Sequence, residues 1–600
     1  MKRRRLLQLA ASGASLALWP HSLPAADPIL RRRRPPDASW PSQAAWAQLD
    51  RATGGNLIAV RSPLSACTNA TSPSCANVFA NLHNPYFIGN TPALTQTLGW
   101  TDAWTSSPSI YAVAARNAHD VAAAVDFARN HDLRLVVKGG GHSYLGTSNA
   151  PDSLLVWTRH MREIEVHDAF VAQGCDARPQ PAVTIESGAL WVHAYDAVTT
   201  KAGRYVQGGG CTTVGVAGLI QSGGFGSFSK HYGMAAAALL EAEVVTADGK
   251  IRIANACTNP DLFWALKGGG GGSFGVVTRL TLRTRELPQY FGFASMTIKA
   301  SSPQAFQRLV REFVSFYAEH LFGDRWGEHV AVRENDALEI SMVSYDVEGD
   351  EATKLWQPFL DWVGRRPGDY SFDSPPRIAS VPPHYWWDPV AIEAQYPKAI
   401  SLNTGPDARP GEFWWAGDGG QVGQFLYGYE SLWLPATLLE GDAQEHLADA
   451  LFAASRHNDI ELHFNKGLAG APADAIAAAR DTATNPTLLH AFALAISADG
   501  QGPAYPGIGG HEPDDATGRE RARQVDACMN ELRAIVPGGG GSYLSESNFF
   551  EPAWQRSYWG SNYPRLAAVK KQYDPGGLFF VHHGVGSEAW SADGFTRLSQ

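Results

Sequence analysis

The sequence predicts an α+β protein made of two folded parts, and three observations lead to this fold class. Its 600 residues exceed what one hydrophobic core usually holds. Residues 105–145 follow a strand–helix–strand pattern, in which short apolar runs flank an amphipathic segment. From about residue 287 onward, alternating strands and helices indicate a second sheet that is backed by helices.

The composition is that of a globular protein, and its charge argues against two classes of partner. Hydrophobic residues make up 44% of the chain and charged residues 18%, which is ordinary for a folded protein. The formal net charge is −10, and it becomes −14 without residues 1–26, which carry four basic side chains and no acidic one. Such a chain has no bulk electrostatic attraction to nucleic acid or to an anionic membrane.

The N-terminus has the pattern of an export signal. Arg3 and Arg4 precede a mildly apolar run over residues 6–19, and residues 24–26 offer small side chains for cleavage. This pattern predicts a twin-arginine signal peptide over residues 1–26, and with it a periplasmic or secreted protein that meets the twin-arginine translocase during export. The alternative is an uncleaved anchor. No later segment approaches about 18 unbroken apolar residues, so we expect no stable membrane insertion after cleavage.

Residues 27–104 are expected to form an N-terminal extension. The four arginines of residues 31–34, followed by two prolines, indicate a solvated linker. Cys67 and Cys75 close a short loop rich in Ser, Thr and Asn, so we expect a disulfide between them in an oxidising compartment. The pairing of the other cysteines stays open. The Cys and His residues lack the spacing of a zinc site, so no metal is expected.

The elements of the first part follow in order along the chain. Residues 110–113 form a strand, and Asn117 caps a helix that has Asp120 in its first turn. The helix buries one face, because its apolar residues recur at the spacing i, i+3, i+4 and i+7. Further strands are expected over 133–137, 182–186, 239–246 and 273–282, and helices over 190–202 and from residue 259.

The second part is predicted to be a sheet covered by helices. Its expected strands are 291–299, 338–343, 460–464 and 491–497, and its expected helices are 303–319, 351–363 and 441–457. This part is also rich in tryptophan, with Trp386, Trp387, Trp414, Trp415 and Trp433. Such rings stack on sugars or enclose aromatic substrates, but large rings between domains more often serve packing.

Two glycine-rich motifs each carry one nucleophilic side chain. In the first motif, glycines at 139–141 precede His142 and Ser143, and in the second, three glycines precede Cys211. Glycine lets backbone amides approach a phosphate or an aromatic ring closely. His and Cys are side chains suited to attack an electrophilic carbon. Two later glycine runs do not fit the dinucleotide fingerprint, which argues against a Rossmann dehydrogenase.

In this order and spacing, the two motifs resemble the flavin-attachment sites of the berberine-bridge-enzyme-like oxidases, a branch of the vanillyl-alcohol-oxidase flavoproteins. Residues 211–278 resemble the PCMH-type flavin-binding domain of these oxidases, and residues 543–579 resemble their C-terminal segment. The resemblance is close over 100–290 and 540–588 and looser between them. Residues 584–590 are similar to the isoamyl-alcohol-oxidase-like members.

The resemblance implies a domain organisation and a cofactor. It implies a PCMH-type FAD-binding domain over 105–288 and a substrate domain over 289–539 that has a β-sheet backed by helices. A berberine-bridge-like segment over 540–590 is expected to pack on the FAD domain. The resemblance also implies that His142 is bonded to the 8α carbon of FAD and Cys211 to ring carbon 6.

The resemblance implies further cofactor contacts. Val214 is expected to face the flavin carbon that meets O2, where valine accompanies oxidase behaviour. The glycine amides around Cys211 are expected to favour its thiolate. The residues expected to bind the cofactor are His142, Cys211, Gly139, Gly140, Gly141, Ser143, Val214, Gly215, Gly218, Gly223, Gly224 and Val276.

The reaction needs a base that takes a proton from the substrate while hydride leaves for the flavin. Tyr543 stands where the family has its active-site tyrosine, and Glu546 follows three residues later, so these two residues are the candidate catalytic pair. A tyrosine is a poor base unless its pKa is lowered, and a core tyrosine is the alternative. Ser545 replaces the asparagine common in relatives. His463 and Asn465 are weaker candidates, for which a solvated strand end is the favoured interpretation.

The sequence therefore predicts a periplasmic or secreted FAD-dependent oxidase that oxidises an alcohol and passes the electrons to O2, forming hydrogen peroxide. Its expected partners are a small-molecule substrate and O2. Three alternatives stay open: an oligosaccharide or sugar oxidase, a dehydrogenase with a quinone or protein acceptor, and a flavin-bearing redox carrier without turnover.

Overall fold

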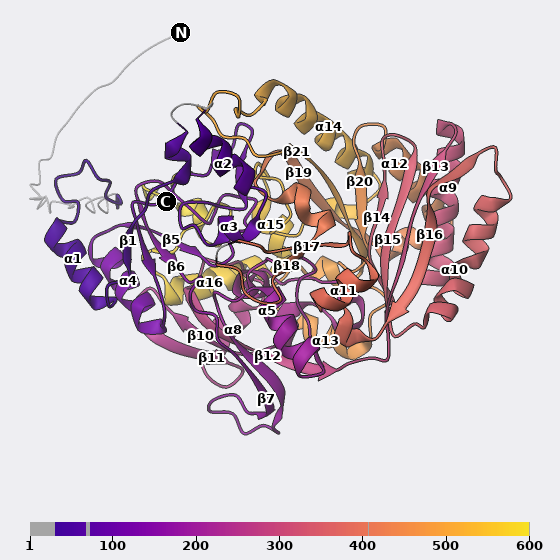
Figure 1. Cartoon of the computed structure of the whole chain (residues 1–600). Helices are drawn as coiled ribbons and strands as arrows, with labels where there is room; N and C mark the ends of the chain where they lie inside the picture. The colour runs from indigo at the N-terminus through magenta and orange to yellow at the C-terminus, as the bar shows by residue number, and fades with distance from the viewer. Residues whose placement is uncertain (1–29, 68–71, 406, 599–600) are drawn as a thin grey trace, which may run out of the picture.

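The computed structural model describes residues 30–67, 72–405 and 407–598, so the predicted signal peptide lies outside the described residues. Three larger sheets of four, six and nine strands organise these residues (Figure 1). None of the helices within the described ranges is long and apolar enough to cross a membrane. The mixed α+β fold class predicted from the sequence is confirmed.

The four-stranded sheet contains the predicted strand–helix–strand unit. Its order is β1 (Leu57–Ala59), β4 (Tyr111–Ala114), β6 (Ser153–Trp157) and β5 (Arg134–Lys138). Strands β4, β6 and β5 are parallel, and α4 (Ala118–Asn130) connects β4 to β5. Asn117 caps α4 by accepting hydrogen bonds from two first-turn amides, and the apolar face of the helix is buried as predicted. Strand β5 ends directly before the first glycine motif.

The six-stranded sheet is antiparallel. Its order is β11 (Ile251–Asn255), β10 (Leu239–Val245), β12 (Val276–Glu286), β8 (Gln180–Glu186) and β7 (Ile164–Phe170), and β9 (Arg204–Val206) pairs with the far end of β12. The predicted helix over 190–202 is α5 (Trp191–Tyr195) followed by a π-helical segment, η2 (Asp196–Lys201). Helix α8 (Pro260–Leu266) follows β11. These elements hold the second glycine motif between β9 and the next short helix, α6 (Val216–Gln221).

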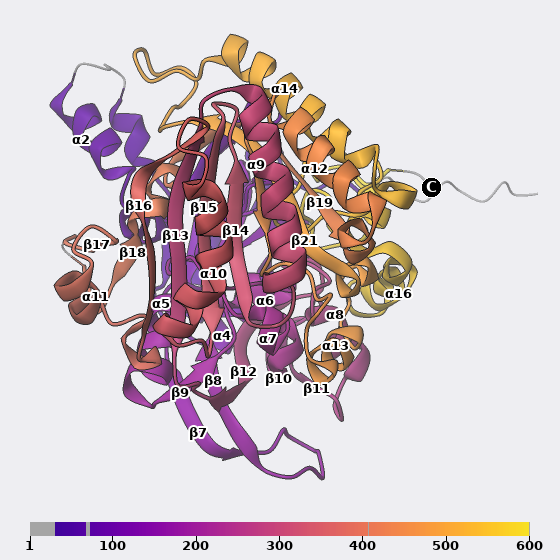
Figure 2. The same cartoon turned by 90° about the vertical axis from the view of Figure 1, so that its right-hand side faces the viewer.

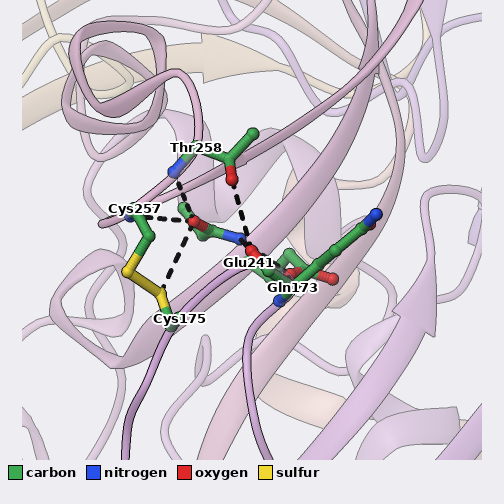
Figure 3. The surroundings of a disulfide bond; sticks show 6 residues. Gln173, Cys175, Glu241, Cys257 and Thr258 are labelled. Carbon is green, nitrogen blue, oxygen red and sulfur yellow. Dashed lines mark hydrogen bonds between the residues drawn. A yellow bond between two sulfur atoms is a disulfide. The ribbon is translucent and has the colours of Figure 1, made fainter.

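A disulfide that the sequence left open ties two loops of this sheet together. Cys175, after β7, is bonded to Cys257, after β11 (Figure 3). The Asn255 side chain lies between the two loops: it accepts hydrogen bonds from the amides of Cys257 and Thr258 at 2.9 and 2.7 Å, and it donates to the Gln173 carbonyl at 2.9 Å. The loops are therefore fixed by both a covalent bond and a polar network.

The nine-stranded sheet forms the second part. Its order is β16 (Tyr370–Val381), β13 (Phe291–Ala300), β15 (Ala337–Tyr345), β14 (Trp326–Val332), β20 (Ile460–His463), β21 (Ala491–Gln501), β19 (Gln424–Pro435), β2 (Thr97–Trp100) and β3 (Trp104–Thr105). Strands β2 and β3 come from the N-terminal segment, which reaches residue 105 at the end of β3, and β2 runs parallel to β19. The N-terminal segment therefore completes the edge of this sheet.

Helices cover one face of the nine-stranded sheet. They are α9 (Pro303–Phe316), α10 (Gly349–Gly364), α12 (Asp442–Ala454) and α14 (Asp515–Arg533). Figure 2 shows α9 and α10 in front of strands β13, β15 and β14. The apolar faces of these helices and of the sheet form one buried cluster, which matches the predicted sheet backed by helices. The opposite face of the sheet is turned toward the first part of the chain.

The C-terminal segment folds back onto the first part of the chain (Figure 1). Helices α15 (Trp554–Trp559) and α16 (Tyr563–Tyr573) belong to the same buried cluster as α8. The indole of Trp559 donates a hydrogen bond to the Gly268 carbonyl at 3.0 Å. Buried Lys570 donates to the Ser273 carbonyl at 2.6 Å. Polar bonds and apolar packing together hold this segment in place.

The prediction of a solvated linker over residues 31–34 is wrong for Arg32. This side chain is only 3% exposed; it donates hydrogen bonds to the carbonyls of Gly594 and Leu578 at 2.8 and 3.1 Å, and it lies over the Trp590 ring. The physical reason is a contact between distant parts of the sequence, because the C-terminal residues around Gly594 lie beside this arginine run. Arg34 likewise forms ion pairs with Asp152 and Asp593. Sequence neighbours do not reveal such partners.

Candidate functional site

The two glycine motifs meet at one place in the structure. A Cβ atom at Gly140 would lie 2.7 Å from the Gly215 nitrogen, and one at Gly215 would lie 2.9 Å from the Gly140 nitrogen. Because real Cβ atoms do not approach backbone this closely, both positions need glycine. His142 Nε2 lies 3.2 Å from Thr213 Oγ1, within hydrogen-bonding distance. His142 therefore contacts a residue of the opposite motif, and this residue follows Cys211 by two positions.

Burial leaves His142 in the protonation state of a nucleophile. The side chain follows β5 and lies inside the contact between the two motifs. Desolvation lowers the pKa of His142 to about 4, although the contact with Thr213 works in the opposite direction. The imidazole is therefore neutral near pH 7, as attack on a carbon atom requires.

Aromatic side chains fix the Cys211 loop. A Cβ atom at Gly208 would lie 2.2 Å from the Trp191 ring, so close packing of this indole requires glycine at that position. Tyr195 donates a hydrogen bond to the Gly209 carbonyl at 2.6 Å, and the indole of Trp415 donates to the next carbonyl, of Gly210, at 3.1 Å. The glycines are therefore needed for the packing of this loop, whether or not they also contact a ligand.

The expectation that Cys211 is a thiolate is wrong for this structure. Burial raises the pKa of Cys211 well above its usual value, and the Asp418 carboxyl raises it further. The positive charge of Lys466 acts in the opposite direction but is outweighed. The thiol is therefore protonated at neutral pH.

Cys211 and Cys528 are the free cysteines, whereas the expected Cys67–Cys75 disulfide is formed.

The other residues expected to bind the cofactor fall into two groups. The first group is closely packed: a Cβ atom at Gly139 would lie 3.1 Å from the Ser187 carbonyl oxygen, and one at Gly223 would lie 2.9 Å from the Thr484 side chain. Gly141, Ser143, Gly224 and Val214 lie within the same loops. In contrast, Gly218 is exposed with open space around it, and Val276 is fully buried at the start of β12.

The arrangement fits FAD on two counts. The backbone of the two motifs approaches without intervening side chains, which leaves amides accessible to phosphate and ring atoms. The hydroxyl group of Ser187, the residue against which Gly139 packs, is buried and has no hydrogen-bond partner among the described residues. Buried hydroxyls of this kind normally find a partner, and the phosphate and ribityl groups of FAD provide both donors and acceptors. Within the described ranges, no group of His, Cys, Asp or Glu is arranged to hold a metal ion.

Tyr543 is buried, and its environment opposes a role as a base. The side chain is 8% exposed and packs edge-on against Phe225, at a distance of 5.2 Å between ring centroids. Burial and the negative charge of Glu546 raise the pKa of Tyr543. Ser545 and the Gly224 backbone are polar neighbours of its hydroxyl group. The hydroxyl therefore stays protonated and acts as a hydrogen-bond donor.

Glu546 forms an ion pair that sequence reasoning missed. Lys466 Nζ donates to both carboxylate oxygens of Glu546, at 2.7 and 2.6 Å. Both side chains are largely buried, with 10% and 20% of their surface exposed. Lys466 follows Asn465 directly, so the only sequence signal for it was its place beside a weak candidate. This ion pair links Lys466 of the second part to Glu546 of the C-terminal segment.

The predicted solvated strand end at His463 and Asn465 is wrong. Asn465 is 2% exposed, and its Oδ1 atom has no partner among the described residues. His463 lies 3.3 Å from Glu461 and stacks on His329 of the neighbouring strand. Burial alone would raise the pKa of Glu461, but the bond from His463 and the charges of nearby basic groups lower it to about 2. The strand end is enclosed because the first part covers this face of the sheet.

The tryptophans of the second part serve packing. Trp387 is 4% exposed and stacks on Tyr195 at 3.9 Å, and Trp433 is 1% exposed beside Phe225. Trp415 is bonded to the Cys211 loop, as described above. These rings are therefore engaged with the protein, which agrees with the packing interpretation.

Two further acidic residues were not found from the sequence. Asp418 lies three residues after Trp415, whose indole is hydrogen-bonded to the Cys211 loop, and burial raises the pKa of Asp418 to about 6. Glu328 lies within β14 in a left-handed backbone conformation, with φ of 62°, which is strained for a residue with a Cβ atom. A Cβ atom at Gly210 would lie 3.5 Å from the Glu328 carboxylate. The only sequence signal for Asp418 was a glycine-rich stretch after two tryptophans.

Comparisons with known proteins agree with this geometry. The chain matches the family model for an FAD binding domain over residues 109–255 and the model for berberine and berberine like proteins over residues 542–586. An FAD-linked oxidoreductase of Arthroderma benhamiae is 30% identical over 94% of this chain and 96% of its own length. The VAO-type flavoprotein oxidase VAO615 of Thermothelomyces thermophilus is 28% identical over 99% of this chain and 98% of its own.

Solved structures share this architecture over most of the chain. The VAO-type flavoprotein MtVAO615 from Myceliophthora thermophila superposes with a TM-score of 0.74 and 26% identity, over 94% of this chain and 99% of its own. Glucooligosaccharide oxidase from Acremonium strictum shares the fold, with a TM-score of 0.62 and 20% identity over 84% of this chain and 95% of its own. Fold and site together define an FAD-linked oxidoreductase. The chain belongs to the berberine-bridge-enzyme-like family of VAO-type flavoproteins.

Proposed function

We propose that this chain is an exported oxidase that holds FAD through covalent bonds to both His142 and Cys211 and oxidises an alcohol with O2. The contact between the two glycine motifs carries the proposal, because it brings both nucleophiles to one place. The glucooligosaccharide oxidase of Acremonium strictum carries a 6-S-cysteinyl, 8α-N1-histidyl FAD. The same two residue types at the meeting point of the motifs support the same attachment here.

The catalytic roles follow from the surroundings of the candidate pair. FAD, when bound, supplies the hydride acceptor of the reaction. Glu546 takes the proton of the substrate hydroxyl group, because it is the carboxylate beside Tyr543. Tyr543 stays protonated and orients the substrate oxygen by donating a hydrogen bond. Lys466 holds the Glu546 carboxylate in place through both oxygens.

An alcohol is proposed in preference to a sugar because two of the tryptophans that would stack on a sugar ring, Trp387 and Trp433, are buried in packing contacts. An oligosaccharide is the second candidate, since proteins of similar fold include a carbohydrate oxidase from Microdochium nivale and a chitooligosaccharide oxidase. Anaerobic mixing with a panel of alcohols and oligosaccharides separates the two. Bleaching of the visible flavin band by alcohols supports the first candidate, bleaching by sugars alone supports the second, and no bleaching indicates a redox carrier.

O2 is the proposed electron acceptor. Val214 lies in the Cys211 loop and is half-buried beside the main core, which is consistent with the expected position against the flavin. Hydrogen peroxide should form in air in proportion to the alcohol consumed. Turnover with a quinone or dye, but without peroxide in air, would instead identify a dehydrogenase.

Export is proposed from the arginine pair at the N-terminus. Replacement of Arg3 and Arg4 by lysine in the full-length chain should leave the precursor in the cytoplasm, while the unchanged chain is found in the periplasm or medium. Equal export of both chains would contradict the twin-arginine route.

The covalent attachment is tested by intact mass after acid denaturation. The unchanged protein, His142→Ala and Cys211→Ala should each retain FAD, because either bond alone holds the cofactor. The double variant should release it completely. Release of all FAD from the unchanged protein would refute covalent attachment, and loss from one single variant would show that only one bond forms.

A further inference from the structure

Asp418 is carried by a segment that is bonded to both sequence neighbours of Cys211. Strand β18 (Phe413–Trp415) continues into the short helical segment η6 (Ala416–Gln421), which contains Asp418. Thr212 Oγ1 donates to the Phe413 carbonyl at 2.7 Å, and the Trp415 indole donates to the Gly210 carbonyl at 3.1 Å. The residues before and after Cys211 are therefore tied to the strand that precedes Asp418.

The far end of this segment is also fixed to the first motif. The Tyr144 hydroxyl donates to Gln421 Oε1 at 3.1 Å, and Tyr144 follows His142 by two residues. Asp418 thus lies between one anchor on the Cys211 loop and another on the His142 loop. This placement brings the Asp418 carboxyl group to the Cys211 loop, where its negative charge acts on the thiol.

The other ionisable groups around the thiol are less suited to take its proton. Glu328 contributes negative charge to both Asp418 and Cys211, but its carboxylate is directed at Gly210. Lys466 is a cation whose charge favours the thiolate once it has formed. His142 faces Thr213 and is itself the second proposed attachment residue. Asp418 remains as the carboxylate whose segment is hydrogen-bonded to the Cys211 loop on both sides of the reacting residue.

We propose that Asp418 is the general base that removes the thiol proton of Cys211 when the sulfur is joined to carbon 6 of the flavin. This inference rests on the proposed attachment of FAD at Cys211. The bond from sulfur to hydrogen breaks as the proton passes to Asp418, and a bond forms from sulfur to carbon 6. The hydrogen on carbon 6 is lost as a proton, and two electrons remain on the ring. O2 takes these two electrons with two protons, giving hydrogen peroxide and the oxidised, attached cofactor.

The His142→Ala background isolates this step, because only the Cys211 bond then holds FAD. The full-length His142→Ala protein is compared with His142→Ala/Asp418→Asn and with a matched control, His142→Ala/Asp373→Asn, whose aspartate is exposed on β16. FAD is added to protein made under riboflavin limitation, and covalent incorporation is followed by mass after acid denaturation. The Asp418→Asn protein should incorporate FAD at least about 100-fold more slowly, as loss of a general base predicts, whereas the control should match its parent.

The outcomes distinguish a failure of the proposed role of Asp418 from a failure of the proposed attachment of FAD at Cys211. If His142→Ala itself releases all FAD in acid, the Cys211 bond does not form, and both proposals are overturned. If His142→Ala retains FAD and the added Asp418→Asn change leaves the incorporation rate within about threefold, the Cys211 bond stands but Asp418 is not its base.

A second measurement covers the case in which the double variant does not fold. In Asp418→Asn with His142 intact, FAD should stay attached to the His142 peptide alone after proteolysis. Cys211 should then react with iodoacetamide in the denatured protein, whereas in the unchanged protein FAD should join the two peptides. Recovery of the joined peptides from Asp418→Asn in the same yield as from the unchanged protein would overturn the inference.

Discussion

Burial acts in opposite ways on the two residues proposed to hold FAD. For both side chains, a water-poor environment disfavours the charged form. The neutral form of His142 is the nucleophile, so burial prepares it for reaction by lowering its pKa to about 4. The neutral form of Cys211 is unreactive, so the same burial suppresses it by raising its pKa. Only the cysteine therefore needs a base, and Asp418 is the residue placed to provide one.

The pH dependence of the Cys211 bond follows from the titration of Asp418, whose pKa burial raises to about 6. The groups that face it are Cys211, Glu328 and His329. Only the carboxylate accepts a proton, so the incorporation rate in His142→Ala should rise with pH, about tenfold per unit below pH 6, and level off above it. Stopped incorporation assays at pH values from about 4.5 to about 8 check this expectation. A rate that keeps rising up to about pH 8 without levelling off would instead indicate direct ionisation of the thiol, whose pKa burial raises well above its usual value.

The Lys466–Glu546 pair should be strongly coupled in stability, because both side chains are largely buried. Lys466→Met leaves a carboxylate without its cation, and we expect a loss of about 3 kcal/mol in the free energy of unfolding. Lys466→Met/Glu546→Gln should recover part of this loss, since no uncompensated charge remains. Urea unfolding of the four proteins measures the coupling. The exposed Arg519–Asp102 pair is the control and should show a much smaller coupling. Additive effects at Lys466 and Glu546 would contradict the expectation.

At the scale of elements, the site depends on loops that are shaped by packing. The run of glycines before Cys211 passes over Trp191, and the carbonyls of this run accept bonds from Tyr195 and Trp415. A loop held at several points by rigid aromatic groups keeps its reactive residue in place without the help of a regular element. The glycines are therefore required for the packing of the loop even before a cofactor binds.

Gly208→Ala tests this view of the loop. Its Cβ atom would lie 2.2 Å from the Trp191 ring, in a contact that must move apart, and we expect a loss of about 2 kcal/mol in stability with reduced FAD incorporation. Gly218→Ala is the matched control, because it lies in helix α6 and nothing approaches its Cβ position within 4 Å. This control should be neutral or stabilising by up to about 1 kcal/mol. Chemical denaturation measures both, and equal stability of the two variants would contradict the packing role of Gly208.

Local patterns in the sequence predicted local structure well. The helix capped by Asn117 and the strands of the first part follow from hydrophobic spacing and capping, which act between near neighbours. Strand β7 is mostly half-buried or exposed, so it shows little apolar periodicity and was missed. The Cys175–Cys257 disulfide joins residues 82 positions apart. Its pairing depends on sheet order, which spacing alone does not determine.

The site was predictable only where a motif carried it. His142 and Cys211 stood out because glycine runs flank them, and the structure brings them together. Asp418 and Lys466 reach the same place from distant segments, through contacts that no local pattern encodes. Asn465 was assigned to solvent because a strand end is usually exposed, and it is buried because the first part of the chain covers that sheet face.

At the scale of the whole molecule, one buried cation joins the two parts. Lys230 lies in α7 (Ser229–Tyr232) of the first part and is 1% exposed. Its amino group donates hydrogen bonds to the carbonyls of Gly467, Phe492 and Ala469 in the second part, at 2.8, 2.9 and 3.2 Å. Two of these carbonyls, those of Gly467 and Ala469, follow Lys466 closely in the sequence, and the third belongs to β21. The same cation therefore fixes both the joint between the parts and the backbone that positions the Glu546 ion pair.

Lys230→Met should weaken the molecule at this joint. Methionine keeps most of the side-chain volume but leaves three carbonyl groups without their donor, and each buried unsatisfied group costs about 1–3 kcal/mol. We expect a total loss of at least about 3 kcal/mol in the free energy of unfolding, together with slower alcohol oxidation, since the Lys466 backbone is no longer fixed. Lys201→Met is the control, because 70% of the Lys201 side chain is exposed, and its stability should stay within about 0.5 kcal/mol of the unchanged protein. Urea unfolding monitored by tryptophan fluorescence gives both values, and a loss below about 1 kcal/mol for Lys230→Met would show that the joint is held by apolar packing instead.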